Sequence, residues 1–263
     1  MTILADKTIK QLCTPPYRDH RIGVIVKECL HKPAQLRALI NAEEERVWDI
    51  DDPDLPDNAD GELETINQIR VEEDYEINNA GKPMIEPFVD HLVRVNENGD
   101  KIISYGLTSY GYDVRLAAEG VKVFTNANGG IVDPMKPDDK CFINGEIRET
   151  DKGLKYFILP PNSYALASTV EWFNIPRNVS VVCLGKSTYA RSCAIVNVTP
   201  VEAGFSGEVV IEISNGSTLP VMIYLETGIA QFQFFHGDVP CEMSYADGNR
   251  KYQGQRGVTL SKV

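Results

Sequence analysis

One apolar segment of the chain carries an acidic residue at a position that could do chemistry. In SGEVVIEISN (206–215), Val209, Ile211 and Ile213 occupy alternate positions. Alternate side chains of a β-strand face opposite sides, so Glu212 faces away from these three, between apolar neighbours. A carboxylate that is held on a strand and partly shielded from water can accept a proton and return it. Glu212 is therefore our first catalytic candidate, although an outward-facing surface position, as expected for Glu208, fits the same pattern.

A second candidate segment, KSTYAR (186–191), lies between two apolar runs. It offers two cations, two hydroxyls and backbone N–H groups, which suit phosphate oxygens or the polar edge of a ring. A solvated surface turn explains the same composition.

Two further segments are polar enough to contact a ligand. SYGLTSYGYD (104–113) favours a glycine-rich structural turn before a strand. The tail after Tyr245 contains Lys251, Tyr252 and Gln255, and it fits either an arm that folds over a ligand or a frayed terminus.

The motifs of several enzyme classes are absent from the sequence. Zinc-dependent nucleobase deaminases carry HxE and PCxxC; here no histidine is followed by glutamate at that spacing, and Pro240-Cys241 lacks the second cysteine. HExxH, GxSxG and the Walker loop are also missing. The sequence therefore supports neither a zinc-activated water nor a serine-based triad.

Charged residues are distributed unevenly along the chain. Of 263 residues, 43% are hydrophobic and the net charge is −12. Between Asn41 and Glu76 there are fifteen acidic and two basic residues, a net of −13, which leaves about +1 for the rest. This favours local basic groups over an extended nucleic-acid-binding face. Six cysteines without a CxxC pair, no secretory leader and no apolar run of membrane-spanning length predict reduced thiols and a cytoplasmic protein without membrane contact.

The spacing of apolar and turn residues divides the chain into an N-terminal helix, a mixed segment and a β-rich body. Residues 1–12 predict a helix with Asp6 as a cap and Ile9 and Leu12 on its apolar face. An amphipathic helix around 33–48, a solvated acidic loop over 49–60 and a weak helix over 62–70 follow; the loop lacks the glycine and glutamate spacing of a calcium-binding EF-hand. From Met84 onward, short strand-like runs, including IVDP (131–134), alternate with turns and predict a barrel or sandwich.

Three segments taken together, ISYGLTSYGYDVRL, VCLGKSTYARSCAIVNVTPVEAGFSGEVVIEISN and SYADGNRKYQGQRGVTL, resemble the dCTP deaminases, relatives of the trimeric dUTPases. The resemblance covers residues 1–12 and 84–263, and residues 13–83 look like an acidic, partly helical insertion. It implies a mainly β fold, a distorted antiparallel barrel of the dUTPase kind with a C-terminal closing arm. It also implies a homotrimer with active sites shared between subunits.

The resemblance implies a site as well. Glu212 is its catalytic residue, and Ser187 and Arg191 are our candidates for orienting the water and stabilising the tetrahedral centre. Lys251 would reach the phosphates. The implied substrate contacts are Lys186, Ser187, Thr188, Tyr189, Ala190, Arg191, Val210, Ile211, Glu212, Gln231, Tyr245 and Gln255.

The expected reaction is hydrolytic, zinc-free deamination of dCTP to dUTP and ammonia, which feeds dUMP and dTTP synthesis. Mg²⁺ is expected to arrive bound to the triphosphate, and dTTP is a candidate inhibitor. Two alternatives stay open. Glu202, where a dUTPase conventionally places an aspartate, leaves room for a bifunctional enzyme that yields dUMP and pyrophosphate. The other alternative is a catalytically silent nucleotide sensor. The acidic insertion is either a surface decoration or a docking site for an unknown partner.

Overall fold

The computed structural model describes residues 2–14, 82–125, 131–136, 138–197, 199–248 and 250–262. The chain divides into two compact units, Met1–Cys13 with Asp74–Val263, and Thr14–Glu73. The two helices and the acidic loop predicted within 33–70 lie outside the described residues, and the limits of an insertion at 13–83 stay a prediction.

The first unit consists mainly of strands. Its helical elements are α1 (Asp6–Cys13), α5 (Ser187–Ala190) and the 3-10 turn η1 (Asp139–Cys141). Its strands are β1 (Thr2–Ile3), β2 (Ile85–Glu86), β3 (Leu92–Val95), β4 (Lys101–Thr108), β5 (Gly111–Arg115), β6 (Lys122–Phe124), β7 (Phe142–Asn144), β8 (Arg148–Glu149), β9 (Lys155–Leu159), β10 (Tyr164–Asn174), β11 (Val179–Gly185), β12 (Ala194–Val196), β13 (Pro200–Val201), β14 (Ser206–Asn215), β15 (Val221–Tyr224) and β16 (Gly228–His236).

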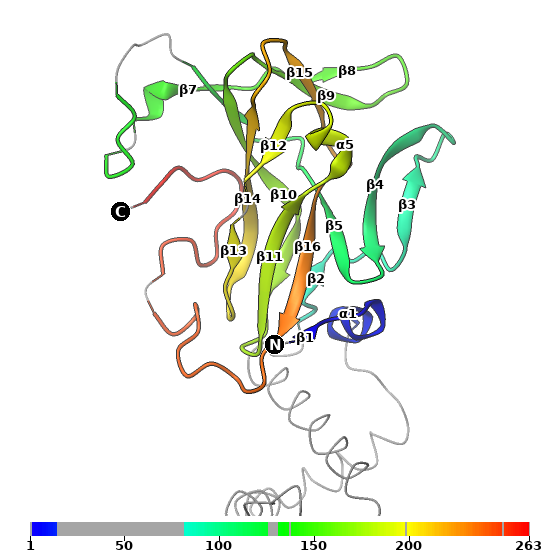
Figure 1. Cartoon of the computed structure of the whole chain (residues 1–263), viewed down its shortest axis with the longest axis vertical. Coiled ribbons are helices and arrows are strands. Elements are labelled where there is room, and N and C mark those ends of the chain that lie inside the picture. The colour runs from blue at the N-terminus through cyan, green and yellow to red at the C-terminus, as the bar shows by residue number, and fades with distance from the viewer. Residues whose placement is uncertain are drawn as a thin grey trace, which may run out of the picture. The chain divides into compact units, whose positions relative to one another are not determined.

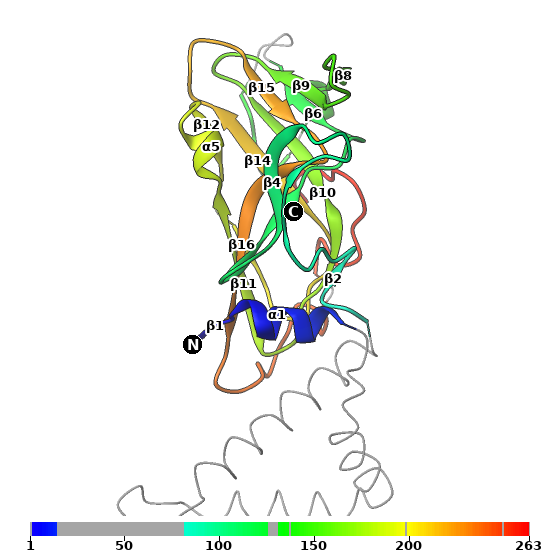
Figure 2. The ribbon, with the colours of Figure 1, turned by 90° about the vertical axis from the view of Figure 1, so that its right-hand side faces the viewer.

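These strands pair in antiparallel sheets (Figures 1 and 2). One sheet runs β13-β11-β16-β5-β4-β3 with β1 on β16, a second runs β12-β14-β10-β6-β7 with β2 on β10, and a third is β15-β9-β8. The predicted mainly β, antiparallel fold is confirmed. Within the described residues, the pairings form these three sheets and do not join into one hydrogen-bonded barrel.

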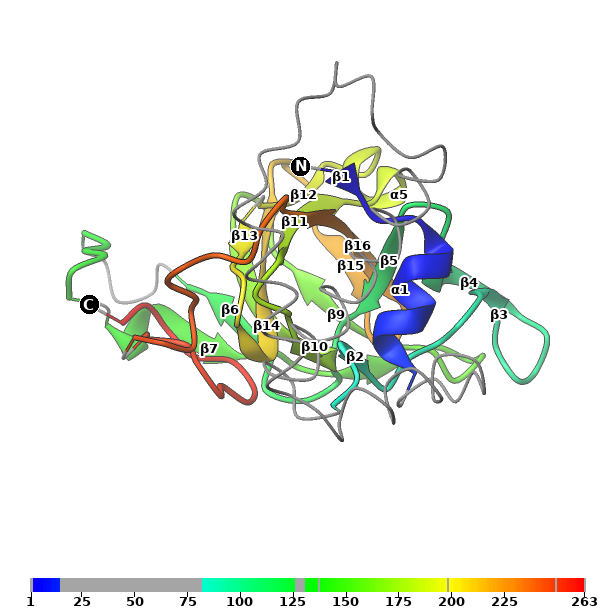
Figure 3. The same ribbon diagram turned by 90° about the horizontal axis from the view of Figure 1, so that it is seen from below.

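The N-terminal helix is shorter than the sequence predicts. Thr2 and Ile3 pair with β16 as β1, so the helix begins only at Asp6. The Asp6 carboxylate accepts a hydrogen bond from the next amide, that of Lys7, at 2.7 Å. Ile9 is fully buried, so the predicted apolar face is the one that packs. Figure 3 shows α1 beside β5 and β4, on the side of this unit away from the C-terminal arm, residues 245–262.

The expected strand over IVDP is wrong. Residues 131–136 form no strand. The Asp133 Oδ1 accepts the Met135 amide at 2.9 Å, an aspartate-closed turn that competes with strand pairing. Pro134 lacks the N–H that a central strand would donate. The segment KSTYAR also differs from the expected open turn, because Ser187–Ala190 form a short helix.

The pairing of β10 with β14 fixes the orientation of the candidate carboxylate. Burial along β14 alternates strictly, with Val209, Ile211 and Ile213 buried and Glu212 partly exposed, as predicted. Leu166 on β10 lies opposite Glu212 in register. Because a shift of one residue would reverse every side chain, this register decides that Glu212 faces away from the core.

A buried ion pair lies where β10 shifts register between Ser168 and Trp172. Glu171 is fully buried, and its carboxylate accepts the Arg115 Nε at 2.7 Å and the Arg115 amide at 3.0 Å. Burial raises the pKa of Glu171, and the adjacent guanidinium opposes that shift. A buried pair of this kind is weak evidence for stability, but loss of either partner leaves the other charge unpaired.

Candidate active site

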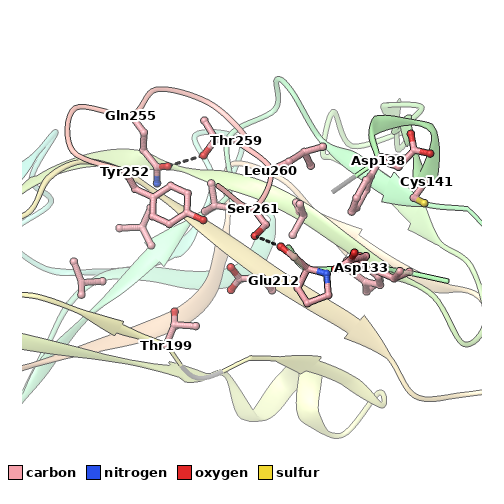
Figure 4. A pocket seen from close by; sticks show the side chains of 18 of the residues that line it. Asp133, Asp138, Cys141, Thr199, Glu212, Tyr252, Gln255, Thr259, Leu260 and Ser261 are labelled. Atoms are coloured by element: carbon pink, nitrogen blue, oxygen red, sulfur yellow. Dashed lines mark hydrogen bonds between the residues drawn. The ribbon is translucent and has the colours of Figure 1, made fainter. Parts of the chain in front are cut away.

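A cavity of about 620 Å³ lies between β14 and the C-terminal arm (Figure 4). Strands β7, β10, β13 and β14 contribute lining residues, as do residues 131–141 and the arm. Figure 4 shows the Glu212 side chain directed into this space, with Thr199 on one side and Ser261 on the other. The strand therefore presents the partly buried carboxylate of Glu212 to a hollow large enough for a nucleotide-sized ligand.

The surroundings of Glu212 favour its protonated form. Burial raises the pKa of this carboxyl, and its own backbone amide offsets only part of the shift. The thiol of Cys183 is affected in turn, because burial and then the nearby Glu212 charge raise its pKa to about 12. A carboxyl with a raised pKa can hold and release a proton nearer to neutral pH, as a proton shuttle must.

The C-terminal arm forms one wall of the cavity. Tyr245 packs edge-on against Phe205, with ring centroids 5.7 Å apart, and its hydroxyl accepts the Tyr252 amide at 3.2 Å. The Gln255 side chain donates to the Glu208 carbonyl at 2.7 Å and accepts the Thr259 hydroxyl at 2.7 Å. The tail is thus an ordered wall in this structure, and the alternative of a frayed terminus does not describe it.

Glu208 holds the arm on β14. Its backbone amide donates to the Gln255 carbonyl at 3.0 Å, and its carboxylate accepts the Gly257 amide at 2.6 Å. Arg256 lies 3.7 Å from the same carboxylate and places its guanidinium 4.4 Å from the centroid of the Trp172 ring. Glu208, expected to be a plain surface residue, is therefore the arm's main polar anchor on this strand.

The segment 186–191 does not line the Glu212 cavity within one chain. Ser187, Thr188 and Arg191 are exposed, and the Arg191 guanidinium donates to the Ser187 carbonyl at 3.3 Å. Tyr189 is buried, and its hydroxyl accepts the Tyr224 amide at 3.0 Å. A single chain therefore does not bring Ser187 and Arg191 to Glu212.

The other predicted contacts fall into two groups. Val210, Tyr245 and Gln255 line the cavity together with Glu212. The Ile211 side chain is buried in the core, and the side chain of Gln231 bonds to Asp113 and Thr108. Exposed Lys251 and Ala190 do not line the cavity.

The cavity is also lined by residues that sequence analysis did not select. They include the carboxylates Asp133 and Asp138, the cation Lys136, the aromatic pair Phe142 and Tyr164, and Thr199, Phe205, Thr259, Leu260 and Ser261. Tyr164 stacks on Phe124 with ring centroids 4.8 Å apart. Phe142 and Tyr164 reach this site through the pairing of β7, β6 and β10 with β14, and the other residues lie in loops or in the arm. No local sequence pattern reveals either arrangement. Glu202, considered only as the residue in the place of a dUTPase aspartate, lines the cavity too.

In the part of the chain that the structure describes, no helix is long and apolar enough to cross a membrane. Among the described residues, the thiols of Cys13, Cys141, Cys183, Cys193 and Cys241 are free. Cys29 lies outside the described residues, and the reduced state of all six stays a prediction.

Comparison with known proteins supplies the family. Residues 69–237 match the dCTP deaminase-like family. The dCTP deaminase of Alcanivorax borkumensis is 56% identical over 184 residues, covering 70% of this chain and 93% of that protein. The dCTP deaminase of Acinetobacter baumannii is 56% identical over 180 residues, covering 68% and 91%.

Solved structures give a weaker likeness. The dCTP deaminase of Agrobacterium tumefaciens matches with a TM-score of 0.36 at 16% identity, over 50% of this chain and 40% of that one. A dUTPase mutant from Staphylococcus aureus phage phi11 matches at 0.34 and 14%, over 58% and 94%. The sequence matches therefore carry the assignment, and by them the chain belongs to the dCTP deaminase-like family.

Proposed function

We propose that this protein hydrolyses dCTP to dUTP and ammonia, with Glu212 as the proton shuttle. The observation that carries the proposal is the placement of Glu212: a partly buried carboxylate with a raised pKa, directed into a cavity of about 620 Å³. The family relationship and the names of relatives at 56% identity support the choice of dCTP.

The chemistry requires two proton transfers. Water attacks C4 of the cytosine ring, and Glu212 takes its proton and passes it to N3. Glu212 then takes the proton of the new C4 hydroxyl and gives it to the amino group. The C4–O bond becomes a carbonyl as the C4–N4 bond breaks, and ammonia leaves. One carboxylate within reach of water and ring can serve both steps, while backbone groups of Val210 and Ile211 read the edge of the base.

The site is completed by a second copy of the chain. Ser187 and Arg191 are exposed in one chain and lie outside the Glu212 cavity. In a homotrimer, the segment 186–191 of a neighbouring subunit would approach the cavity. Its hydroxyls and backbone N–H groups would contact phosphates, and Ser187 and Arg191 would orient the water and stabilise the tetrahedral centre. Each well-placed donor of this kind is worth about 3–4 kcal/mol of transition-state stabilisation.

The remaining proposed contacts come from the C-terminal arm. Tyr245 and Gln255 would contact the nucleotide from the arm, and Lys251 would reach the phosphates. A cavity lined by Asp133, Asp138, Glu202 and Glu212, with Lys136 as a cation, repels a bare triphosphate. Its donor chemistry fits Mg²⁺ carried on the triphosphate oxygens, where the ion offsets this repulsion. We propose no zinc at the reacting carbon, because Glu212 performs the activation of water.

Product analysis tests the proposal. The full-length protein with dCTP and Mg²⁺ should release ammonia and dUTP in equal amounts. Glu212→Gln should keep dCTP binding and lose ammonia release, because the amide cannot accept the water proton. Ser214→Ala, on the same face of β14, is the matched control and should retain turnover. Turnover by Glu212→Gln near that of the wild type would remove Glu212 from the mechanism.

One observation favours a second candidate function. Glu202 lines the same cavity as Glu212, so a carboxylate is available to activate water for attack on phosphorus. A bifunctional enzyme would convert dCTP to dUMP and pyrophosphate, and Glu202→Gln would then stop the reaction at dUTP. Accumulation of dUTP by the wild-type protein would exclude this second activity.

A further inference from the structure

A partly buried polar cluster lies at the start of the segment 186–191, and its residues do not line the Glu212 cavity. We call it the Asp113 cluster; its members are Ser104, Thr108, Asp113, Lys186 and Gln231. Asp113 on β5 is only 3% exposed and lies directly opposite Gln231 on β16. A carboxylate this deep in a sheet must be paired to be tolerated.

Both oxygens of the Asp113 carboxylate have partners. The Lys186 ammonium forms an ion pair with Oδ2 and also donates to the Ser104 hydroxyl at 3.2 Å. The Gln231 amide donates to Oδ1 at 3.2 Å and to the Thr108 hydroxyl at 3.3 Å. The side chain of Lys186 is 12% exposed. The ammonium is therefore committed to the interior of its own subunit.

The packing around the lysine stem is close. A Cβ atom placed on Gly228 would lie 1.9 Å from the Ser104 carbonyl oxygen and 3.4 Å from the Lys186 Cδ. Only a glycine at position 228 lets β4 pass this close to β16, and the lysine stem lies in van der Waals contact beside it. For the ammonium to turn toward a ligand, it would have to leave Asp113 charged, buried and without its cation, which is costly.

The pair of Lys186 and Asp113 affects the segment of chain that directly follows Lys186. Lys186 directly precedes α5, and its carbonyl accepts the Tyr189 and Ala190 amides, each at 3.1 Å. The Ser187 carbonyl in turn accepts the Arg191 amide at 3.1 Å. Fixing the Lys186 side chain against β5 therefore fixes the backbone from which Ser187 and Arg191 project.

We propose that Asp113 is a positioning residue for the deamination reaction and acts through Lys186. The pair tethers the segment 186–191 to the sheet, so that Ser187 and Arg191 are presented to a neighbouring subunit in one fixed geometry. The Lys186 ammonium serves as the tether, and the segment contacts the nucleotide through its hydroxyls and backbone. This inference rests on the proposed deaminase function.

The test is a double-mutant cycle with Asp113→Asn, Lys186→Met and the combined variant. Ammonia release from dCTP gives kcat and KM at low and high salt, and thermal unfolding gives Tm. Each single change should lower kcat by about 100-fold, the order expected when a reacting group is displaced by an ångström. The combined variant should regain Tm, because no unpaired charge remains buried, but its kcat should stay as low as in the singles.

A surface ion pair provides the control. Asp100 and Lys152 pair at 2.8 Å with their side chains 26% and 59% exposed, so Asp100→Asn should change neither kcat nor Tm measurably. Three results would overturn the proposal. One is recovery of kcat together with Tm in the combined variant, which would leave a structural role only. Another is normal kcat in Asp113→Asn. The third is a salt-dependent rise in KM confined to Lys186→Met, which would make Lys186 a direct phosphate ligand.

A measurement that does not depend on turnover distinguishes failure of this proposal from failure of the proposed function. If the wild-type protein released no ammonia from dCTP, the function would fail while the tether would still be measurable. Hydrogen–deuterium exchange at the amides of 187–191 should then rise in Asp113→Asn and stay at the wild-type rate in Asp100→Asn. Unchanged exchange in Asp113→Asn would reject the tether.

Discussion

At the scale of single residues, the environment of Glu212 would couple the proposed catalysis to pH. The carboxyl lies between apolar Leu166 and Val210 in a partly closed cavity, and burial raises its pKa above the 4.5 of an exposed glutamate. A base must be ionised to accept a proton from water. The same burial that would ready Glu212 to deliver a proton in the proposed reaction would therefore limit its use as a base in acid.

The acid limb of the pH–rate profile follows from this coupling. We expect kcat/KM for dCTP to fall with decreasing pH, with a midpoint above 4.5, because the raised pKa of Glu212 sets the loss of its ionised form. Rates measured between pH 4 and 8 check this. A midpoint at or below 4.5 would mean that the base is another, more solvated group.

The raised pKa of Glu212 should also affect the stability of the fold, with the opposite dependence on pH. A carboxyl whose pKa is raised on folding contributes stability at low pH that is lost as pH rises through the folded-state pKa. The Glu212→Gln variant has no ionisable group at this position, so it does not lose this stability as the pH rises. We expect the variant to unfold at a higher temperature than wild type near pH 7, and the difference to shrink as the pH is lowered. A variant less stable than wild type at pH 7 would contradict the raised pKa.

At the scale of elements, the C-terminal arm depends on a strand residue that the sequence did not distinguish. Glu208 and Glu212 alternate on one face of β14, and nothing in SGEVVIEISN separates a catalytic carboxylate from an anchoring one. Only the structure shows that Glu208 accepts the Gly257 amide, whereas Glu212 faces the cavity. Family resemblance supplied the choice of Glu212, and alternation supplied its orientation.

Removal of the anchor should loosen the arm. Glu208→Ala deletes a charge-assisted hydrogen bond and the Arg256 contact, so we expect KM for dCTP to rise about tenfold, the equivalent of about 1.4 kcal/mol. Trypsin should also cut faster after Arg250 and Lys251. Exposed Glu242, changed to Ala, is the control. Equal cleavage rates in the two variants would show that Glu208 does not hold the arm.

A glycine at the edge of the Asp113 cluster tests the packing of the sheet. Gly228→Ala should destabilise the fold by about 3 kcal/mol, since the added methyl group meets the Ser104 carbonyl and β4 must shift. Gly216→Ala adds a methyl group whose nearest neighbour is 3.8 Å away, and it should leave stability nearly unchanged. Urea unfolding of both variants measures the difference, and similar values would contradict the close approach.

These elements also show how far sequence reasoning extends. Period-two alternation predicted β14 and its two faces correctly, because burial on one face of a strand leaves a local signature. The strand over IVDP was wrong, because an aspartate-closed turn and a proline outweighed its apolar residues. The far wall of the cavity was not predictable. Strands β7 and β10 reach β14 only through pairing between distant segments, and β13 belongs to a different sheet. The same holds for Asp113, which the sequence placed in a structural turn.

At the scale of the whole molecule, the proposed division of the site between subunits has a consequence for mixed assemblies. Within one chain, Glu212 faces its own cavity while Arg191 is exposed outside it. If each active site takes Glu212 from one subunit and Arg191 from the next, two differently disabled chains can build intact sites together. A site formed within one chain has no such property.

Subunit mixing therefore decides between a shared and a single-chain site. Glu212→Gln and Arg191→Ala should each be nearly inactive alone. Unfolded together in equal amounts and refolded, random assembly should restore about one quarter of wild-type activity, because a site is intact only when both of its contributing subunits carry the needed residue. Glu212→Gln mixed with the double variant Glu212→Gln/Arg191→Ala should restore none. Absence of recovery in the first mixture, with mixed oligomers confirmed by native mass spectrometry, would place Glu212 and Arg191 in one chain's site, and the fixed presentation of 186–191 to a neighbour would lose its purpose.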